Sequence, residues 1–351
     1  MKMAPFLNGK KHEVKTMKNI ITIDTGTTNT RVVLWQHGDV TAMAKQPVGV
    51  RDTAITGSKT KLKQAIKLCI DSVLAEQQIT STENIIAVAS GMITSNLGLV
   101  EIPHLTAPVG LSDLADGMQS VTIPDVFDQP IWFIPGVKNN DRDISPETIP
   151  NMDVVRGEEV EAIGAIKALG IDGPALIILP GSHTKMMKIN EHGEIVGSIT
   201  SMTGELLDLL TKESILADSV ESQFVDQLDR NSLVLGARTA KENGLGRTAF
   251  IVRLLGMYSD FTRNQRANYL LGAVLENDIH ALVNTKAFSL EADEPIVILG
   301  KPGLRDALKI LIQADDNLTE NVITKEIANL AGRGAIEIAE QRQIFELTGG
   351  K

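Results

Sequence analysis

Two short apolar runs near the start of the chain flank a polar turn. Residues 20–23 and 32–35 are almost entirely apolar, and the stretch DTGTTNTR at 24–31 lies between them. This pattern predicts a β-hairpin with a Gly- and Thr-rich turn. The second half repeats it, with an apolar run at 175–179, a polar turn at 180–185 and a returning strand at 186–189, followed by a third strand at 195–199. Each half is therefore expected to open with strand, turn, strand.

The rest of the chain alternates between helical and strand-like segments. Apolar positions at helical spacing predict helices at 58–78 and 157–169, from about 304, and at 327–345, and residues 204–282 are almost wholly helical. Short buried strands are expected at 85–89, 131–134 and 296–299. The alternation predicts an α/β fold with ligands at the sheet edge. The expected division is a loose leader at 1–16, a first α/β domain at 17–150, a second with a helical insertion at 151–326, and a closing helix at 327–351.

Composition removes several classes of function. A net charge of −10 and an aromatic content of 3% argue against a nucleic-acid partner. The single cysteine, Cys69, excludes a disulfide within the chain, and its apolar helical surroundings favour a packing role. No apolar run reaches the roughly 18 residues typical of a membrane span, and the start lacks the apolar core of a signal peptide. A cytoplasmic protein without a membrane partner is expected, and a homodimer is among the states that the sequence allows.

The first turn carries residues suited to phosphate. Gly26 lets the backbone approach a ligand closely, and Thr27 and Thr28 supply small hydrogen-bond donors. Asp24, at the end of the first strand, could order water around Mg²⁺, which keeps several waters when it binds phosphates. The turn could hold the outer phosphates of ATP. The alternative is an ordinary polar hairpin turn.

The second turn offers a similar set. Gly181 and Ser182 supply backbone and hydroxyl donors, and His183 and Lys185 add positive or titratable charge. Across a cleft from the first turn, it would complete a cage for a triphosphate. Taken alone, it could also be a surface turn with a chance histidine.

Acidic residues gather where the second half begins. Asp153, Arg156, Glu158 and Glu159 lie just before or in the first turn of a predicted helix. Acids favour helix N-termini through capping and the helix dipole, so a structural role explains them in part. A kinase also needs a carboxylate to accept a hydroxyl proton and an arginine to hold an anionic substrate.

A third glycine-rich segment follows the strand at 296–299. The sequence ILGKPGL at 298–304 could be the edge under an adenine ring, or a plain strand-to-helix turn. The stretch GLGRTA at 244–249 fits a dinucleotide fingerprint by its letters. It follows a helical segment instead of a strand, so it is discounted.

The motifs together resemble one family of kinases. They are IDTGTTNTR at 23–31, ASGMITSNLG at 89–98, EIPHLTAPVG at 101–110, FIPGVK at 133–138, VVRGEE at 154–159, PGSHTK at 180–185 and MTGEL at 202–206. From about residue 19 to 341 the chain resembles the 2-dehydro-3-deoxygalactonokinase family, within the superfamily of sugar kinases, actin and heat-shock chaperones. The resemblance implies a two-domain, ribonuclease H-like fold with an ATP cleft. It also implies transfer of the ATP γ-phosphoryl group to the 6-hydroxyl of 2-dehydro-3-deoxy-D-galactonate in galactonate catabolism.

The resemblance also implies roles for individual residues, with Mg²⁺ as cofactor and ATP as co-substrate. Asp24 would manage the metal, and Glu158 would be the catalytic base, with Asp153 and Glu159 behind it. The remaining roles fall into three sets: for the phosphates Gly26, Thr27, Thr28, Arg31, Gly181, Ser182, His183 and Lys185; for the adenosine Gly204, Gly300 and Gly303; and for the sugar acid Ser90, Gly91, Met92, Glu101, His104 and Arg156.

Two residues depart from the family pattern. Thr25 and Met186 stand where tryptophan is usual, which could alter packing around the turns or mark a shifted substrate. A kinase for a related ketodeoxy sugar acid therefore stays open. So do a sugar-independent ATPase of the same superfamily and an exopolyphosphate hydrolase.

Overall fold

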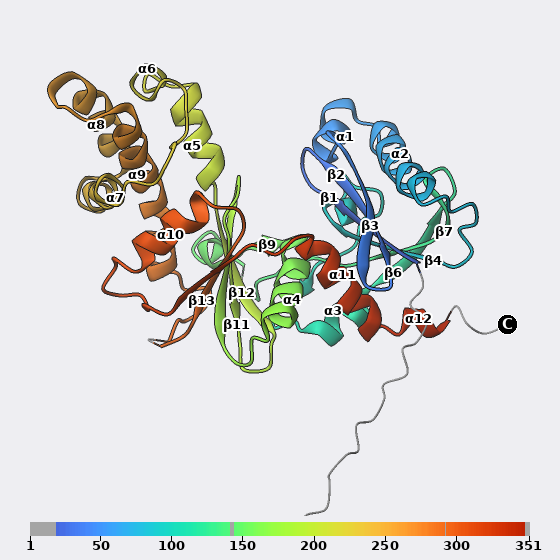
Figure 1. Cartoon of the computed structure of the whole chain (residues 1–351). Coiled ribbons are helices and arrows are strands. Elements are labelled where there is room, and N and C mark those ends of the chain that lie inside the picture. Colours follow the sequence, from blue (N-terminus) through green and yellow to red (C-terminus); the bar gives the residue numbers. More distant parts are fainter. Residues whose placement is uncertain (1–18, 141–143, 292, 348–351) are drawn as a thin grey trace, which may run out of the picture.

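The computed structural model describes residues 19–140, 144–291 and 293–347, and the expected leader at 1–16 lies outside them. The chain forms an α/β structure with two lobes (Figure 1). Each lobe is built on its own sheet, and the two sheets share a strand order.

The first lobe contains a six-stranded sheet in the order β3-β2-β1-β4-β7-β6. Strands β1, β4 and β7 run parallel, whereas β2, β3 and β6 are antiparallel to their neighbours. Helices α1 and α2 cover one face (Figure 1). The apolar face predicted for the helix at 58–78 is buried in the core of this lobe. The strands are β1 Asn19–Thr25, β2 Thr30–Gln36, β3 Asp39–Gln46, β4 Ile85–Gly91, β6 Gln119–Ile123 and β7 Phe127–Phe133.

The second lobe repeats the arrangement with five strands in the order β12-β11-β10-β13-β14. Strands β10, β13 and β14 are parallel, and β10 pairs with β11 as an antiparallel hairpin. The expectation that both halves open with strand, turn, strand is confirmed. The strands are β10 Ala175–Leu179, β11 Thr184–Ile189, β12 Ile195–Ser201, β13 Ile296–Leu299 and β14 Val322–Lys325.

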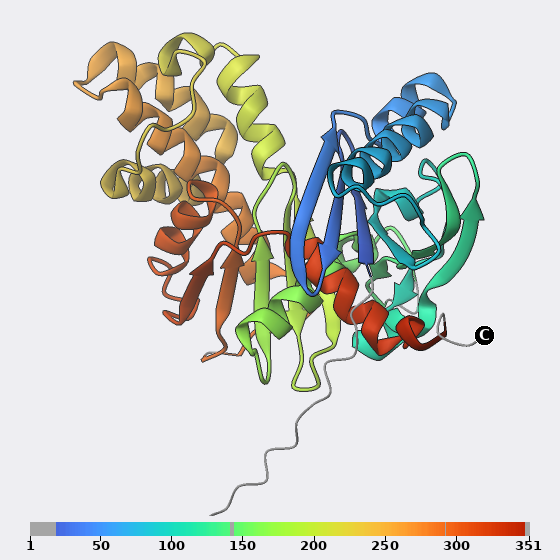
Figure 2. The same cartoon turned by 45° about the vertical axis from the view of Figure 1, so that its right-hand side comes forward.

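The helices form a bundle on the second lobe, whereas α4 and α11 lie between the lobes and α1 and α2 cover the first lobe (Figure 2). The bundle consists of α5 Thr203–Lys212, α6 Ala217–Val220, α7 Arg230–Asn243, α8 Leu245–Tyr258 and α9 Arg263–Asn284. The other helices are α1 Val50–Thr56, α2 Thr60–Glu76, α3 Leu111–Gly117, α4 Glu158–Leu169, α10 Leu304–Ile312, α11 Leu330–Gln341 and α12 Ile344–Leu347, with short 3-10 helices η1 Met92–Thr94 and η2 Ile149–Asn151.

Helices α4 and α11 cross between the two lobes at close range. A side chain at Gly334 would overlap with the carbonyl oxygen of Val160, so glycine allows the two backbones to touch. One apolar core contains residues of α4, α11 and both sheets. A small sheet of β5 Leu105–Thr106, β8 Val137–Lys138 and β9 Val154–Val155 lies at the same junction. The start of α4 is therefore fixed by packing from both sides.

Several boundaries differ from the sequence prediction. The closing helix expected at 327–345 is α11 followed by the short α12, because Gln343 adopts a left-handed conformation (φ 58°) between them. The strand expected at 131–134 begins earlier, at Phe127, and the one expected at 186–189 begins at Thr184. The expected domain limits remain a prediction. Within the described ranges, no helix combines the length and the apolar character needed to cross a membrane.

Candidate active site

The first turn, between β1 and β2, rests against the start of α1. The carbonyl oxygens of Gly26 and Thr27 accept hydrogen bonds from the amides of Val50 (3.2 Å) and Arg51 (2.9 Å). A side chain at Gly49 would overlap with the Gly26–Thr27 backbone. In a planar trans peptide the C=O and the following N–H point in opposite directions. The amides of Thr27 and Thr28 therefore point away from α1, and both residues are exposed.

The second turn, between β10 and β11, is supported in the same way by α5. The carbonyl oxygens of Gly181 and Ser182 accept hydrogen bonds from the amides of Gly204 (3.2 Å) and Glu205 (3.0 Å). A side chain at Gly204 would overlap with the Gly181 carbonyl oxygen. The amides of Ser182 and His183 consequently point away from α5. Both turns thus present consecutive N–H groups, as anion-binding backbone does.

Backbone contact between glycines brings the first turn to the acidic start of α4. A Cβ at Gly91, where φ is +87°, would lie 2.6 Å from the carbonyl oxygen of Thr25 and 3.1 Å from Oδ1 of Asp24. A Cβ at Gly157, where φ is +118°, would lie 3.1 Å from the Cα of Gly91. Asp24 also pairs with Ser90 and Arg31 on the two neighbouring strands. The predicted metal residue, the end of β4 and the N-terminus of α4 therefore meet at one point.

Four carboxyl groups influence one another at this point. Burial raises the pKa of Asp24, Arg31 opposes this effect, and the charge of Glu158 adds to it. Burial and the Glu158 charge raise the pKa of Glu159 to about 8. Glu159 is fully buried, and both its carboxyl oxygens accept from the Gly157 amide, at 2.9 and 2.7 Å. Glu159 therefore fixes the start of the helix, whereas Glu158 keeps part of its side chain exposed and accepts from the Arg156 amide at 2.9 Å.

Glu161 is a member of this acidic cluster that the sequence reasoning did not identify. Burial, followed by the charges of Asp24, Glu158 and Glu159, raises its pKa to about 8. It stands three residues after Glu158, so both lie on one face of α4. That spacing was the available signal, but Glu161 lies outside the RGEE motif.

The second turn is linked to Asp153 through a threonine. Lys185 Nζ donates to Oγ1 of Thr200 (3.0 Å), which donates to the carboxylate of Asp153 (2.9 and 3.0 Å). His183 Nε2 lies 2.8 Å from Oε2 of Glu205, with both side chains 44% exposed. Asp153 thus neighbours the second turn, whereas Glu158 neighbours the first.

The residues predicted for the sugar acid lie around Arg156. Its two terminal nitrogens donate to Thr94, through the carbonyl oxygen (2.7 Å) and Oγ1 (2.6 Å), to the Ile102 carbonyl oxygen (3.1 Å) and to the His104 ring. Burial, with the charges of Arg156 and Lys138, lowers the pKa of His104 to about 4. His104 is therefore neutral near pH 7.

Other residues in this group differ in exposure and position. Ser90 is buried at the end of β4, and Met92 is half-buried in η1. Glu101 is exposed, and its charge acts on Arg156. The group therefore combines a guanidinium, a neutral imidazole and a lysine with one nearby acid.

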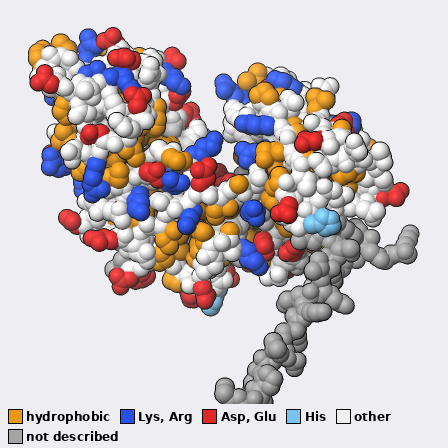
Figure 3. Space-filling view, viewed as in Figure 1, with side chains coloured by type: hydrophobic (Ala, Val, Ile, Leu, Met, Phe, Trp, Pro, Cys, Tyr) orange, Lys and Arg blue, Asp and Glu red, His pale blue; other side chains and the backbone are white. Residues whose placement is uncertain are grey.

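A pocket of about 550 Å³ opens beside the second turn. Gly204 from α5 and Gly300 after β13, two of the three residues predicted for adenosine, line it. The third, Gly303, lies just outside, and a Cβ there would lie 3.7 Å from the ring of Phe224. A second hollow of about 530 Å³ shares Gly204, Asp208 and Leu304 with the pocket and extends to Gly181 and Ser182. Figure 3 shows the surface hollowed between the lobes, with acidic and basic side chains along it.

The donor set near Asp24 fits a metal that arrives with phosphates. Mg²⁺ is usually held by one or two carboxylates together with waters and phosphate oxygens. Asp24, Glu158 and Glu161, which are all partly buried, offer such oxygens. In the portion of the chain that is described, no three His, Cys, Asp or Glu residues form a group that could hold a metal ion.

Both departures from the family pattern are buried. Thr25 is fully buried, and its Oγ1 lies 3.3 Å from Oγ1 of Thr30, while Met186 is 1% exposed. Both side chains are therefore part of the packing of β1 and β11.

Two curated proteins are similar to this chain in sequence. The chain is 30% identical over 199 residues to a probable 2-dehydro-3-deoxygalactonokinase of Rhizobium meliloti, a match spanning 56% of this chain and 58% of that relative. It is 28% identical over 267 residues to the 2-dehydro-3-deoxygalactonokinase of Escherichia coli, covering 75% of this chain and 80% of that protein.

A solved structure supports the fold. A crystal structure of a protein assigned as a 2-dehydro-3-deoxygalactonokinase from Sinorhizobium meliloti superposes with a TM-score of 0.70 at 24% identity, covering 92% of this chain and 97% of that one. The family model for 2-keto-3-deoxy-galactonokinase matches residues 24–336. The chain therefore belongs to the 2-keto-3-deoxy-galactonokinase family, whose members are ATP-dependent kinases.

Proposed function

We propose that this protein transfers the γ-phosphoryl group of ATP to the 6-hydroxyl of 2-dehydro-3-deoxy-D-galactonate, in galactonate catabolism. Family membership supports the reaction. One observation carries the site: the acidic start of α4 is fixed against Asp24 and the first turn through the Gly91–Gly157 contact. A carboxylate held beside a phosphate-binding turn is what phosphoryl transfer to a hydroxyl requires.

The nucleotide would span the second lobe and reach the first. Adenosine would occupy the pocket lined by Gly204 and Gly300, next to Gly303. The phosphates would then meet the amides of Ser182 and His183 and, across the hollow, those of Thr27 and Thr28. Gly26 and Gly181 let both turns approach the anion, and Arg31 and Lys185 add positive charge beside them. These groups are aligned before the reaction, which is how fixed dipoles stabilise developing charge.

Mg²⁺ would be held by Asp24, with Glu161 as the neighbouring carboxyl. When bound there, the metal would supply positive charge against the phosphate oxygens. Arg31 keeps the pKa of Asp24 from rising further, which favours the ionised form that a metal needs.

Glu158 is the proposed base. It is the more exposed member of the RGEE pair, whereas Glu159 is buried against the Gly157 amide. Its carboxylate is oriented by the Arg156 amide at 2.9 Å and would accept the proton of the attacking hydroxyl. Asp153, bound to Thr200 beside the second turn, is the alternative.

The sugar acid would lie at the end of β4, over Ser90, Gly91 and Met92. Arg156, neutral His104 and Lys138 form the positive side of this region, with Glu101 at its edge. The bonds from Arg156 to Thr94, Ile102 and His104 account for four of its five N–H groups, which leaves Nε–H for a substrate carboxylate. Arg156 would therefore both organise this region and contribute to anion binding.

The test is ADP release from ATP-Mg²⁺ in three parallel reactions. One contains 2-dehydro-3-deoxy-D-galactonate, one contains the gluconate epimer, and one contains no sugar acid. Turnover with the galactonate form alone is expected. Turnover with only the epimer would mean a related sugar acid, and equal ADP release without sugar would point to an ATPase.

A further inference from the structure

The aromatic residue Phe224 lines the pocket of about 550 Å³ that is proposed to hold adenosine. Phe224 is the one aromatic among the residues that line this pocket. The others come from α5, from the segment between β13 and the start of α10, and from Pro180 in the second turn. Its side chain remains 41% exposed. An aromatic face beside a cavity suits a purine, because every base has a π-face that stacks on aromatic rings.

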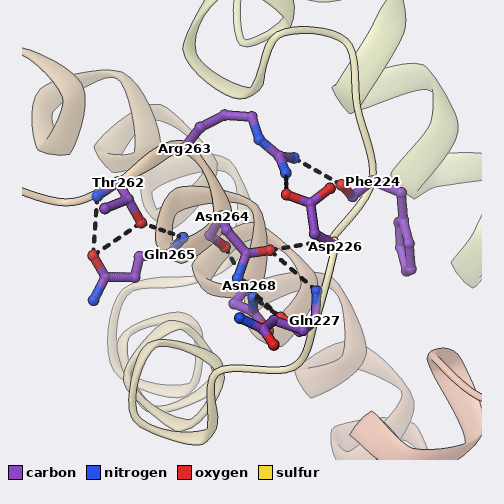
Figure 4. A network of polar contacts seen from close by, with 8 residues as sticks. All are labelled: Phe224, Asp226, Gln227, Thr262, Arg263, Asn264, Gln265 and Asn268. Atoms are coloured by element: carbon purple, nitrogen blue, oxygen red, sulfur yellow. Dashed lines mark hydrogen bonds and ion pairs between the residues drawn. The ribbon is translucent and has the colours of Figure 1, made fainter.

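The loop that carries Phe224 is fastened to the start of α9 (Figure 4). Arg263 donates to the Phe224 carbonyl oxygen at 2.8 Å and forms an ion pair with Asp226. Asn264 accepts from the Asp226 amide (2.9 Å) and donates to the Gln227 carbonyl oxygen (2.9 Å). The loop between α6 and α7 thus receives from side chains the hydrogen bonds that a strand partner would otherwise supply.

A second asparagine completes the attachment. Asn268 is fully buried, donates to the Gln227 carbonyl oxygen (3.0 Å) and accepts from the Asp229 amide (2.9 Å). Glu221 and Ser222, at the start of the loop, have φ values of 54° and 52°, which L-residues adopt only when their surroundings require it. The loop is therefore held in one specific conformation.

Phe224 does not itself anchor this loop. Its neighbours Val225 and Leu228 pack against the core of the second lobe, whereas Phe224 does not join that cluster. The loop is thus secured by α9 and by two aliphatic side chains, and Phe224 remains among the residues that line the pocket.

We infer that Phe224 is the surface on which the adenine ring stacks, and that Arg263 is a positioning residue that fixes this ring through the backbone of Phe224 and the carboxylate of Asp226. The inference rests on the proposed function for the location of the adenosine. It adds a nucleobase contact and the structure that holds it, neither of which lies in the glycine-rich segments.

The test compares a ligand with a base and a ligand without one. Dissociation constants of ADP and of inorganic tripolyphosphate are measured by calorimetry for the whole protein and for Phe224→Ala. Loss of one stacked base should weaken ADP binding roughly tenfold to a hundredfold, while tripolyphosphate binding stays within about twofold. Phe250→Ala, at a phenylalanine that is 44% exposed on α8 and outside the pocket lining, is the matched control and should change neither constant.

Arg263→Met tests the positioning role. It should weaken ADP binding in the same direction by a smaller factor, and the double variant should bind ADP no worse than Phe224→Ala alone, because both act on one contact. Additive losses in the double variant would overturn the positioning role. Unchanged ADP affinity in Phe224→Ala, or an equal loss for tripolyphosphate, would overturn the stacking role.

The same samples separate this inference from the proposed function. If ADP affinity falls in Phe224→Ala while the unaltered protein shows no sugar-dependent turnover, the stacking role stands and the proposed reaction fails. If the unaltered protein turns over the sugar acid and Phe224→Ala keeps the KM for ATP, the reaction stands and the stacking role fails.

Discussion

The first and second turns are supported by their helices in the same way but have different surroundings. In each, two consecutive carbonyl oxygens accept from two consecutive amides at the start of a helix, α1 behind the first turn and α5 behind the second. In each, a glycine of the supporting segment, Gly49 or Gly204, lies where a side chain would overlap with the turn. We call this arrangement of two hydrogen bonds and one glycine the mount of a turn. The mount directs the peptide groups of both turns in the same way relative to the supporting helix.

The two turns differ in the side chains that lie around them. The first turn adjoins Asp24, Glu158 and Glu161, where burial and mutual repulsion raise the pKa of Asp24 and Glu161. The second turn adjoins exposed pairs such as His183–Glu205 and an open pocket. The same backbone arrangement can therefore hold phosphate in both lobes, while the proposed proton transfer to Glu158 depends on the carboxyl cluster beside the first turn. The predictions below test that division.

Glu158→Gln should have the largest effect. Without its base, the attacking hydroxyl keeps its proton, and kcat should fall about 10²–10⁴-fold. The KM for ATP should change little, because the mounts of both turns are intact. Steady-state kinetics with saturating sugar acid measure both constants.

Asp153→Asn is the matched comparison at the second turn. It removes a charge that is bound to Thr200 and should lower kcat far less than Glu158→Gln does. The reverse result, with near-normal turnover in Glu158→Gln and a large loss in Asp153→Asn, would transfer the role of base to the second turn.

Gly204→Ala and Gly49→Ala should have the next largest effects. Each added methyl group would overlap with backbone atoms of a turn, so the turn and its helix must separate. A displacement of about 1 Å in a positioning element can cost up to 10²-fold, and we expect kcat/KM for ATP to fall roughly 10- to 100-fold in both variants.

Gly246→Ala is the control for this pair. Gly246 lies in the first turn of α8 with no atom near the position of an added Cβ, so kinetics should be unchanged. If Gly204→Ala were harmful and Gly49→Ala harmless, the two mounts would not be equivalent and the first turn would bind phosphate by other means.

How far the sequence predicts this site depends on the range of each interaction. The two hairpins follow from local patterns, and β10 and β13 begin and end where the apolar runs do. The Gly91–Gly157 contact joins residues 66 positions apart, and the mount of the second turn depends on a helix that begins some 20 residues later. The sequence did not identify Glu161, because its raised pKa depends on burial in the fold. It did not identify Phe224, because the position of Phe224 depends on a loop that α9 holds in place. Neither feature is encoded by a sequence motif. The family resemblance supplied the substrate, which no local pattern could.

Glu161→Gln should have a smaller, pH-dependent effect on stability. The pKa of Glu161 is about 8 in the folded protein against 4.5 as its ordinary value, so between these values the folded chain holds a proton that the unfolded chain has released. The free energy of unfolding therefore falls as pH rises through this range. Glutamine removes that contribution, and the melting temperature should exceed that of the unaltered protein by about 2–4 °C near pH 8.5.

The pH dependence of that difference is the decisive readout. The gain in melting temperature should shrink as pH falls from 8.5 to 6, because Glu161 in the folded protein is then protonated and neutral, like glutamine, and taking up that proton costs less free energy at lower pH. Glu213→Gln, at an exposed residue that follows α5, should show no such trend. A gain that is constant with pH would mean that Glu161 does not titrate within the cluster.

Glu205→Gln should have the smallest effect and tests the second turn directly. Because the His183–Glu205 pair is 44% exposed on both sides, solvent screens it, and such pairs contribute about 0.2–1 kcal/mol. The KM for ATP should rise less than about fivefold with kcat unchanged, because the Glu205 amide still donates to the Ser182 carbonyl oxygen. A large loss of kcat would mean that this pair takes part in the chemical step, and the division between a reacting turn and a holding turn would then fail.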